Sequence, residues 1–217
     1  MKLELTGAKS KPTTILCLGA HSDDIEIGCG GSILQLKKSL GEIKFHWVVL
    51  CATGKRAEEA SRAASLFTAG SDAEVVFKDF RDGFLPYTGS AVKDFFEELK
   101  SCVDPDLIFT HWQGDAHQDH RLVSELTWNT FRNHLILEYE IPKYDGDLGR
   151  PNVFVPLDGP TADQKINHLF EFFVSQQSKP WFDRETFRGL MRIRGMESNS
   201  SSGFAEAFYA RKIVLEA

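Results

Sequence analysis

Short apolar runs alternate with amphipathic stretches along the first two thirds of the chain. Five runs of β-branched, aliphatic and aromatic residues predict buried strands: residues 14–18, 45–51, 74–77, 107–110 and 135–141. Four stretches between them have the apolar spacing or alanine content of helices: residues 33–40, 58–69, 92–102 and 122–131. Strands separated by helices of this length indicate βαβ units. We therefore expect an α/β fold, a Rossmann-like three-layer sandwich with a mainly parallel sheet.

The chain changes character after residue 144. Residues 145–152 are rich in glycine, proline and asparagine and predict a long loop. Thr161 and Gln164 fit a capping box that would open a helix through Phe173, and residues 207–215 predict a terminal strand. Because no linker separates a second domain, we expect one domain over residues 1–217, in which residues 145–217 form an extension that shapes the site.

Composition limits the class of partner. The chain has 217 residues, with 25 Lys and Arg against 31 Asp and Glu, and its net charge of −6 argues against nucleic-acid binding. No apolar run reaches the roughly 18 residues that a membrane helix needs, and the first 14 residues lack the apolar core of a secretory signal. The four cysteines form no CxxC pair. We expect reduced thiols in a cytoplasmic protein that spans no membrane.

The polar residues after the first predicted strand are the first candidate for a site, because ligands of an open parallel sheet bind beyond the carboxyl ends of its strands. His21 and Asp24 are three residues apart, as on one turn of helix, so their side chains can converge on an ion such as Zn²⁺. Asp23 points elsewhere in that turn. The alternative is that Ser22, Asp23 or Asp24 caps the following helix. Residues 28–32 read GCGGS and lack the GxGxxG pattern of dinucleotide binding.

The second candidate follows the fourth predicted strand. Asp115, His117, Asp119 and His120 fall within six positions, and a solvated loop with incidental histidines is the alternative reading. The first predicted strand is expected to be central with a later strand beside it, so the two polar loops can face one another. Together they allow a site with two histidines and one carboxylate, with positions left open for water, as in catalytic zinc centres. Ferrous iron also suits such donors.

At these residues the chain resembles the PIG-L/LmbE-like family of metal-dependent N-deacetylases. Its residues 20–24, Ala-His-Ser-Asp-Asp, are similar to the family motif Ala-His-Pro-Asp-Asp. Its residues 117–120, His-Gln-Asp-His, match the motif His-x-Asp-His, preceded by Asp115. Ser22 stands where the family has proline, which would fix φ and stiffen the turn. Serine is expected to preserve the ligands with looser geometry.

The resemblance implies a role for each motif residue. It implies that His21, Asp24 and His120 hold the metal and that Asp23 is the general base. It implies that His117, as an imidazolium, stabilises the oxyanion or protonates the leaving amine, and that Asp119 is the partner that orients His117.

We therefore expect a zinc-dependent N-deacetylase that hydrolyses the N-acetyl group of a small amino sugar or N-acetylglucosamine conjugate, with Fe²⁺ or another divalent ion as other choices. The family resemblance also leaves a homo-oligomer open. One alternative is a metallohydrolase of another amide or ester, and another is a catalytically silent sugar-binding relative. Further candidates for substrate contacts, each with a plain structural alternative, are His111, Trp112, Arg56, Arg150, Tyr144, Asp145 and Asp147.

Overall fold

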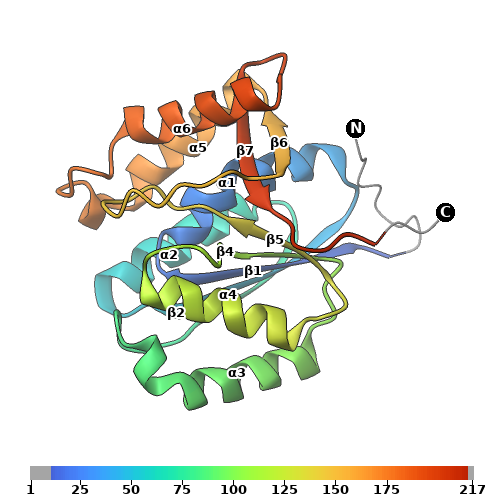
Figure 1. The fold of residues 1–217 in the computed structure, drawn as a ribbon, viewed down its shortest axis with the longest axis vertical. Coiled ribbons are helices and arrows are strands. Elements are labelled where there is room, and N and C mark those ends of the chain that lie inside the picture. The colour runs from blue at the N-terminus through green and yellow to red at the C-terminus, as the bar shows by residue number, and fades with distance from the viewer. Residues whose placement is uncertain (1–10, 215–217) are drawn as a thin grey trace.

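A seven-stranded sheet forms the centre of the molecule (Figure 1). The computed structural model describes residues 11–214. The strands lie in the order β3-β2-β1-β4-β5-β7-β6, and the five strands from β3 to β5 run parallel. β7 is antiparallel to both of its neighbours. The strands are β1 (Thr13–His21), β2 (Ile43–Cys51), β3 (Asp72–Phe77), β4 (Leu107–His111), β5 (Leu135–Tyr139), β6 (Val153–Leu157) and β7 (Phe204–Tyr209).

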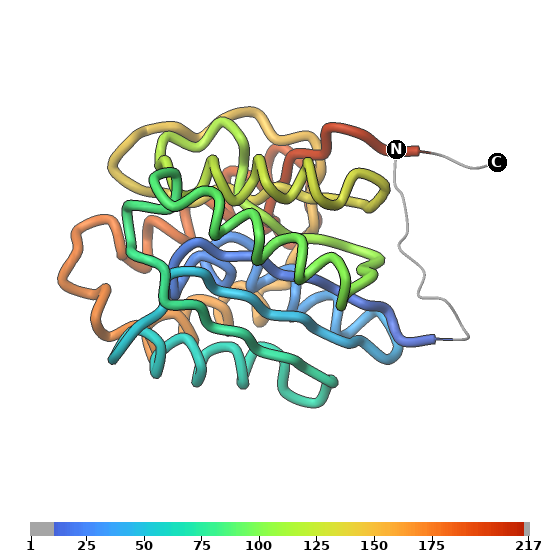
Figure 2. Tube along the Cα trace, turned by 90° about the horizontal axis from the view of Figure 1, so that it is seen from below, coloured from blue at the N-terminus to red at the C-terminus, as the bar shows by residue number. Residues whose placement is uncertain are grey.

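Helices cover both faces of the sheet and complete the predicted three-layer sandwich (Figures 1 and 2). One apolar core contains side chains from α1 (Asp24–Ser39), α2 (Gly54–Phe67), α5 (Gly159–Phe172) and α6 (Arg184–Glu197). A second core contains side chains from α3 (Gly89–Cys102) and α4 (Gln118–Thr130). Two short 3₁₀ helices, η1 (Leu85–Thr88) and η2 (Val174–Gln176), lie in the connections.

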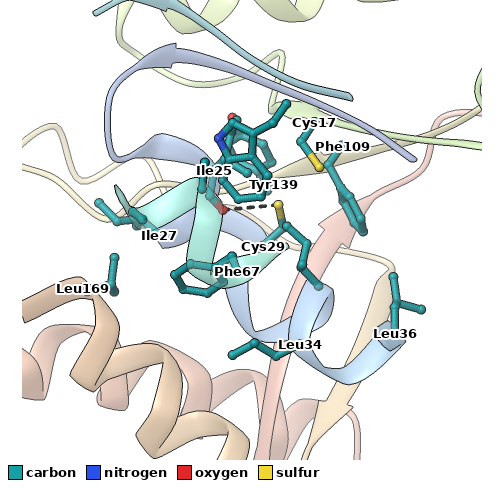
Figure 3. Packing of buried hydrophobic residues seen from close by; sticks show 14 of the residues in the cluster. Cys17, Ile25, Ile27, Cys29, Leu34, Leu36, Phe67, Phe109, Tyr139 and Leu169 are labelled. Atoms are coloured by element: carbon teal, nitrogen blue, oxygen red, sulfur yellow. Dashed lines mark hydrogen bonds between the residues drawn. The ribbon is translucent and has the colours of Figure 1, made fainter. Parts of the chain in front are cut away.

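The central position of β1 explains its unbroken apolar sequence. Successive side chains of a strand point to opposite faces. Ile15 and Cys17 enter the first core, while Leu16 and Leu18 enter the second. Because both faces are covered, no position of this stretch needs a polar residue. Figure 3 shows part of the first core, where the Cys29 thiol of α1 donates to the Ile25 carbonyl at 3.3 Å.

The glycines of α1 allow close packing against the sheet and against helix α2. A Cβ at Gly28 would lie 2.2 Å from the Tyr139 ring, and one at Gly30 would lie 2.7 Å from the Phe67 ring. A Cβ at Gly31 would lie 2.6 Å from Leu157 and 2.9 Å from the Glu206 carboxylate. These glycines therefore bring α1 close to its neighbours.

Several boundaries differ from the sequence-based prediction. α1 begins at Asp24, well before the predicted residue 33, because tertiary packing overrides the low helix propensity of its glycines. The capping box at Thr161 is wrong, since α5 is capped by Asp158, which accepts from the Thr161 amide at 2.7 Å. β6 and α6 were not predicted. β7 ends at Tyr209, well before the end of the strand predicted over residues 207–215. Leu215 and most of the first 14 residues, which were considered as a secretory signal, lie outside the described residues.

No helix within residues 11–214 combines the length and apolar character needed to cross a membrane.

Candidate active site

The two polar loops meet because β1 and β4 are neighbours in the sheet. β1 ends at His21 and passes directly into α1, which begins at Asp24. β4 ends at His111, and α4 begins at Gln118, so His120 lies in the first turn of that helix. The carboxyl ends of these parallel strands open at the same edge of the sheet, as the sequence predicts.

Three donor atoms form a compact triangle at this edge. His21 Nδ1 lies 3.1 Å from His120 Nε2 and 3.3 Å from Asp24 Oδ2, and His120 Nε2 lies 3.5 Å from Asp24 Oδ2. Metal–ligand distances of about 2.0–2.1 Å at tetrahedral angles put zinc ligands about 3.3–3.4 Å apart. All three residues are less than 8% exposed. The donors thus have the chemistry and the separation of a metal site.

Asp24 lies among three imidazoles. Its Oδ2 atom is 3.2 Å from His111 Nε2, in addition to its contacts with His21 and His120. Burial alone would raise the pKa of Asp24, but the neighbouring imidazoles of His120, His111 and His21 hold that pKa well below its usual range. Asp24 is therefore a carboxylate, as a metal ligand must be.

The His120 ring is oriented from behind by Asp115. His120 Nδ1 lies 3.0 Å from Asp115 Oδ2, and Lys143 Nζ lies 2.9 Å from the same oxygen. Although burial raises it, the pKa of Asp115 is held well below its usual range by the His120 hydrogen bond and by nearby positive charges. A carboxylate on one ring nitrogen directs the lone pair of the other nitrogen toward the triangle of donor atoms from His21, Asp24 and His120, called the ligand triangle below. The sequence indicated Asp115 only as the acidic residue before the motif.

His111 is a buried packing residue next to the triangle. Its ring stacks on His120 with centroids 3.9 Å apart, and its Nε2 accepts from the Ala20 amide at 3.0 Å. That lone pair is engaged, so His111 is a poorer metal ligand than His21, even though its donor atom is within 4.8 Å of those of Asp24 and His120. Because His111 is fully buried, its position does not favour the substrate contact considered from the sequence.

Asp23 occupies the N-cap position of α1 without capping the helix. Its side chain makes no cap hydrogen bond, and its buried Oδ2 has no partner among residues 11–214. Arg56 is the nearest cation, with Nη2 3.8 Å from Asp23 Oδ1. Burial and the charge of Asp24 raise the pKa of Asp23 to about 6. The capping alternative is therefore not supported for Asp23, whose free oxygen is available to a proton.

His117 lines the pocket, and its contacts favour a neutral imidazole over the imidazolium that the resemblance implies. As N-cap of α4, its Nδ1 accepts from the Asp119 amide at 3.2 Å. Burial and the charges of His120 and His21 lower the pKa of His117. In the neutral ring the proton then lies on Nε2, as assigned from this hydrogen bond. His117 can donate one N–H bond into the site.

The Asp119 carboxylate does not pair with the His117 ring, contrary to the expectation. Its Oδ2 accepts from the Gly83 amide at 2.7 Å, and its Oδ1 accepts from the Leu85 amide at 3.1 Å. Oδ2 also lies 3.4 Å from His21 Nε2. The first turn of α4 directs this side chain toward the segment after β3. Asp119 therefore anchors that segment against His21.

The ligand triangle opens into a pocket of about 340 Å³. Besides His21, Asp23, Asp24, His117 and His120 of the two loops, it is lined by Arg56, Asp82, Ile141, Lys143, Tyr144, Asp145, Gln176, Lys179 and Trp181. The extension predicted to shape the site contributes Asp145 and the last three of these. Lys179 and Trp181 were missed, because no motif marks them in the sequence.

Three of the weaker candidates have other positions. Trp112 stacks on Tyr209 with ring centroids 4.5 Å apart, away from the pocket lining. Asp147 accepts from the Ala116 amide at 2.7 Å and pairs with Lys143. Arg150 is not part of the described pocket lining.

Comparison with known proteins identifies related sequences and folds. The model of the PIG-L family, described as GlcNAc-PI de-N-acetylase, matches residues 16–131. The protein described as uncharacterized deacetylase YaiS, from Escherichia coli (strain K12), is 31% identical over 149 residues, which cover 64% of this chain and 79% of YaiS.

Two solved structures share the fold across almost the whole chain. The N,N'-diacetylchitobiose deacetylase of Pyrococcus horikoshii superposes with a TM-score of 0.69 at 21% identity, covering 91% of this chain and 83% of that one. The 4-carboxy-2-hydroxymuconate hydratase GalB of Pseudomonas putida KT2440 superposes with a TM-score of 0.71 at 18% identity, covering 94% and 98%. Since one fold carries a deacetylase and a hydratase, function must be argued from the site.

Proposed function

The chain belongs to the PIG-L/LmbE-like deacetylase family, and from this membership and the geometry of the site we propose that it is a metal-dependent N-deacetylase acting on an amino sugar or an N-acetylglucosamine conjugate. The observation that carries the proposal is the triangle of donor atoms from His21, Asp24 and His120, with an Asp23 oxygen beside it that has no partner within residues 11–214. The names of the family model and of the chitobiose enzyme are those of sugar deacetylases, which supports the substrate class.

The donor set fits a divalent cation, and we propose zinc. Two imidazole nitrogens and one carboxylate oxygen leave further coordination positions open toward the pocket, which is the pattern of a catalytic centre. The electrostatic surroundings of His21 favour a cation at this position. Burial alone would lower its pKa, yet the charge of Asp24 and the contacts with Asp119 and Asp82 raise the pKa of His21 well above its usual value. When bound, the ion would acidify a water molecule and polarise the acetyl carbonyl.

The chain's own residues supply the proton transfers. Asp23 accepts a proton from the attacking water, since its Oδ2 is buried and unpartnered. The water oxygen bonds to the acetyl carbon, and the N–H at Nε2 of His117 donates to the oxygen that becomes negative. Asp23 then returns the proton to the amide nitrogen as the C–N bond breaks. The second proton of the water leaves the new carboxyl group and passes to the amine, so the products are acetate and an ammonium group, and atoms and charges balance.

The pocket suits a small polar ligand with one flat apolar face. Its volume of about 340 Å³ is at the low end of the range for small-molecule pockets. Trp181 and Tyr144 offer aromatic surface, while Arg56, Lys143 and Lys179 offer hydrogen-bond donors. This mixture fits a sugar ring that carries hydroxyl groups.

Acetate release from a panel of N-acetylhexosamine conjugates tests the proposal. The protein is stripped with a chelator, reloaded with zinc and assayed in parallel with Asp23→Asn and Asp24→Asn. We expect turnover by the reloaded protein, metal retention without turnover in Asp23→Asn, and loss of metal in Asp24→Asn. Turnover of another amide or an ester without any acetylated sugar would overturn the substrate class. Full activity of Asp23→Asn would overturn the assignment of the base.

A further inference from the structure

The second ring nitrogen of His21 faces a group of donors that the proposed mechanism does not use. His21 Nε2 lies 3.0 Å from Asp82 Oδ1 and 3.4 Å from Asp119 Oδ2. The donor atoms of His21, Cys51 and Asp119 all lie within 4.8 Å of one another. Despite these neighbours, buried Nε2 has no well-aligned hydrogen-bond partner among the described residues. An ion between these atoms would satisfy all of them at once.

The fold holds these donors in place before any ion arrives. His21 and Cys51 end the adjacent strands β1 and β2 and are paired in register. The Asp119 carboxylate is fixed by the amides of Gly83 and Leu85. Cys51 and His21 are 5% and 7% exposed, and Asp119 is fully buried. A site assembled on rigid elements loses little conformational freedom on binding.

Asp82, whose Oδ1 lies 3.0 Å from His21 Nε2, is the more accessible candidate for a fourth donor. Its side chain is about half exposed, at 52%, and it also pairs with Arg56 at 2.7 Å. Asp82 and His21 both line the pocket, which gives an ion a route to the buried thiol. The set of one imidazole, one thiol and two carboxylates is a four-donor set of the kind that binds zinc.

We propose that His21 Nε2, Cys51, Asp119 and Asp82 form a second site that binds a thiophilic divalent cation such as Zn²⁺ or Cd²⁺. The thiolate selects such ions over Mg²⁺ or Ca²⁺, which prefer oxygen donors. Binding displaces the thiol proton of Cys51 and the Nε2 proton of His21, and both protons pass to the solvent.

Because His21 belongs to both sites, an ion in the second site inhibits turnover at the first. The ion draws electron density from the same imidazole whose Nδ1 belongs to the ligand triangle. It also neutralises the Asp119 carboxylate that holds residues 83–85 against that ring. This consequence for turnover rests on the proposed function, whereas occupancy of the site does not.

Cadmium titration of the protein already loaded with one equivalent of zinc tests occupancy without any substrate. The readout is the ultraviolet charge-transfer absorption of a cadmium–thiolate bond. We expect the band to saturate with one added equivalent in the wild-type protein and to vanish in Cys51→Ser. Cys102→Ser is the matched control, since Cys102 is an exposed free thiol at the end of α3. The band should persist in this control.

Three results decide the proposal further. A band that survives Cys51→Ser, or one that Cys102→Ser abolishes, overturns it. If Cys51→Ser does not fold, the ¹¹³Cd spectrum of the wild-type protein decides, because one signal must carry the downfield shift of a thiolate ligand.

In the acetate assay, excess zinc should inhibit Cys51→Ser at least tenfold more weakly than wild type, each relative to its own uninhibited rate. A protein without deacetylase activity would still give the absorption result, so the two proposals fail separately.

Discussion

A buried ion pair behind α1 provides a quantitative test of how the fold supports the site. Lys165 of α5 and Glu206 of β7 form this pair, and they are 3% and 4% exposed. Glu206 Oε1 accepts from the Gly31 amide at 2.8 Å, and Oε2 accepts from the Ser32 amide at 2.6 Å. Lys165 Nζ also donates to the Ile27 carbonyl at 2.6 Å. The pair thus joins α5 and β7 to the backbone of the helix that carries Asp23 and Asp24.

The variant Glu206→Gln changes only the carboxylate into a carboxamide. Both oxygens of Glu206 accept from N–H donors, so the new NH₂ group faces another donor in either orientation of the amide. The Lys165 ammonium also loses its counter-charge in a buried position. Removing one member of a buried pair costs about 3–5 kcal/mol. For a domain of this size that cost lowers Tm by roughly 6–20 °C.

Urea denaturation and thermal melting of the metal-free protein measure this cost. Asp163→Asn is the matched control, because it makes the same chemical change in the Asp163–Arg188 pair, whose side chains are 56% and 41% exposed. We expect the control to change the free energy of unfolding by less than about 1 kcal/mol. The double variant Lys165→Met/Glu206→Leu should lose less free energy of unfolding than its two single variants lose together, since no lone charge remains buried. A Glu206→Gln cost no larger than that of Asp163→Asn would refute the reasoning.

Three further predictions concern the metal site and its packing. Asp115→Asn should weaken zinc affinity by about 10–100-fold, because Asp115 orients His120; competition with a chromogenic chelator measures it, and an unchanged affinity would contradict the role. Zinc at about 100 times its Kd should add about 2.7 kcal/mol of stability; the rise in Tm should disappear in Asp24→Asn, and an equal rise there would place the ion elsewhere. Gly28→Ala should cost about 1–3 kcal/mol through overpacking, since its Cβ would lie 2.2 Å from the Tyr139 ring; an unchanged Tm would reject the close packing of α1 on the sheet.

The strands of the first half could be predicted because their environment is uniform. β1 and β2 are buried along almost their whole length, and such strands have a continuous apolar sequence. β6 gives a weaker signal, since it is a partly exposed edge strand that contains Pro156. The first two turns of α1 escaped prediction because the reasons for their glycines are tertiary. Tyr139 and Phe67, which fill the space beside these glycines, come from other elements.

The motif residues of the site could be located from the sequence, but their partners could not. His21, Asp23, Asp24 and His120 come together because the loops after the neighbouring parallel strands β1 and β4 open at one edge of the sheet. The contacts that orient them depend on details the sequence does not carry. The contact of the Asp119 backbone amide, rather than the Asp119 carboxylate, with His117 Nδ1 is one such detail.

The charges around the triangle favour a bound cation. Asp23, Asp24 and Asp119 are buried, Asp24 and Asp119 lie 3.3 and 3.4 Å from the His21 ring nitrogens, and Arg56 lies 3.8 Å from Asp23. Without an ion, His21 must hold a proton to balance these carboxylates, which is why its pKa is raised against the effect of burial. A divalent ion at Nδ1 replaces that proton and supplies twice its charge. Zinc binding should therefore release protons, and the number of protons released, measured in weakly buffered solution, should fall when His21 is replaced by Gln.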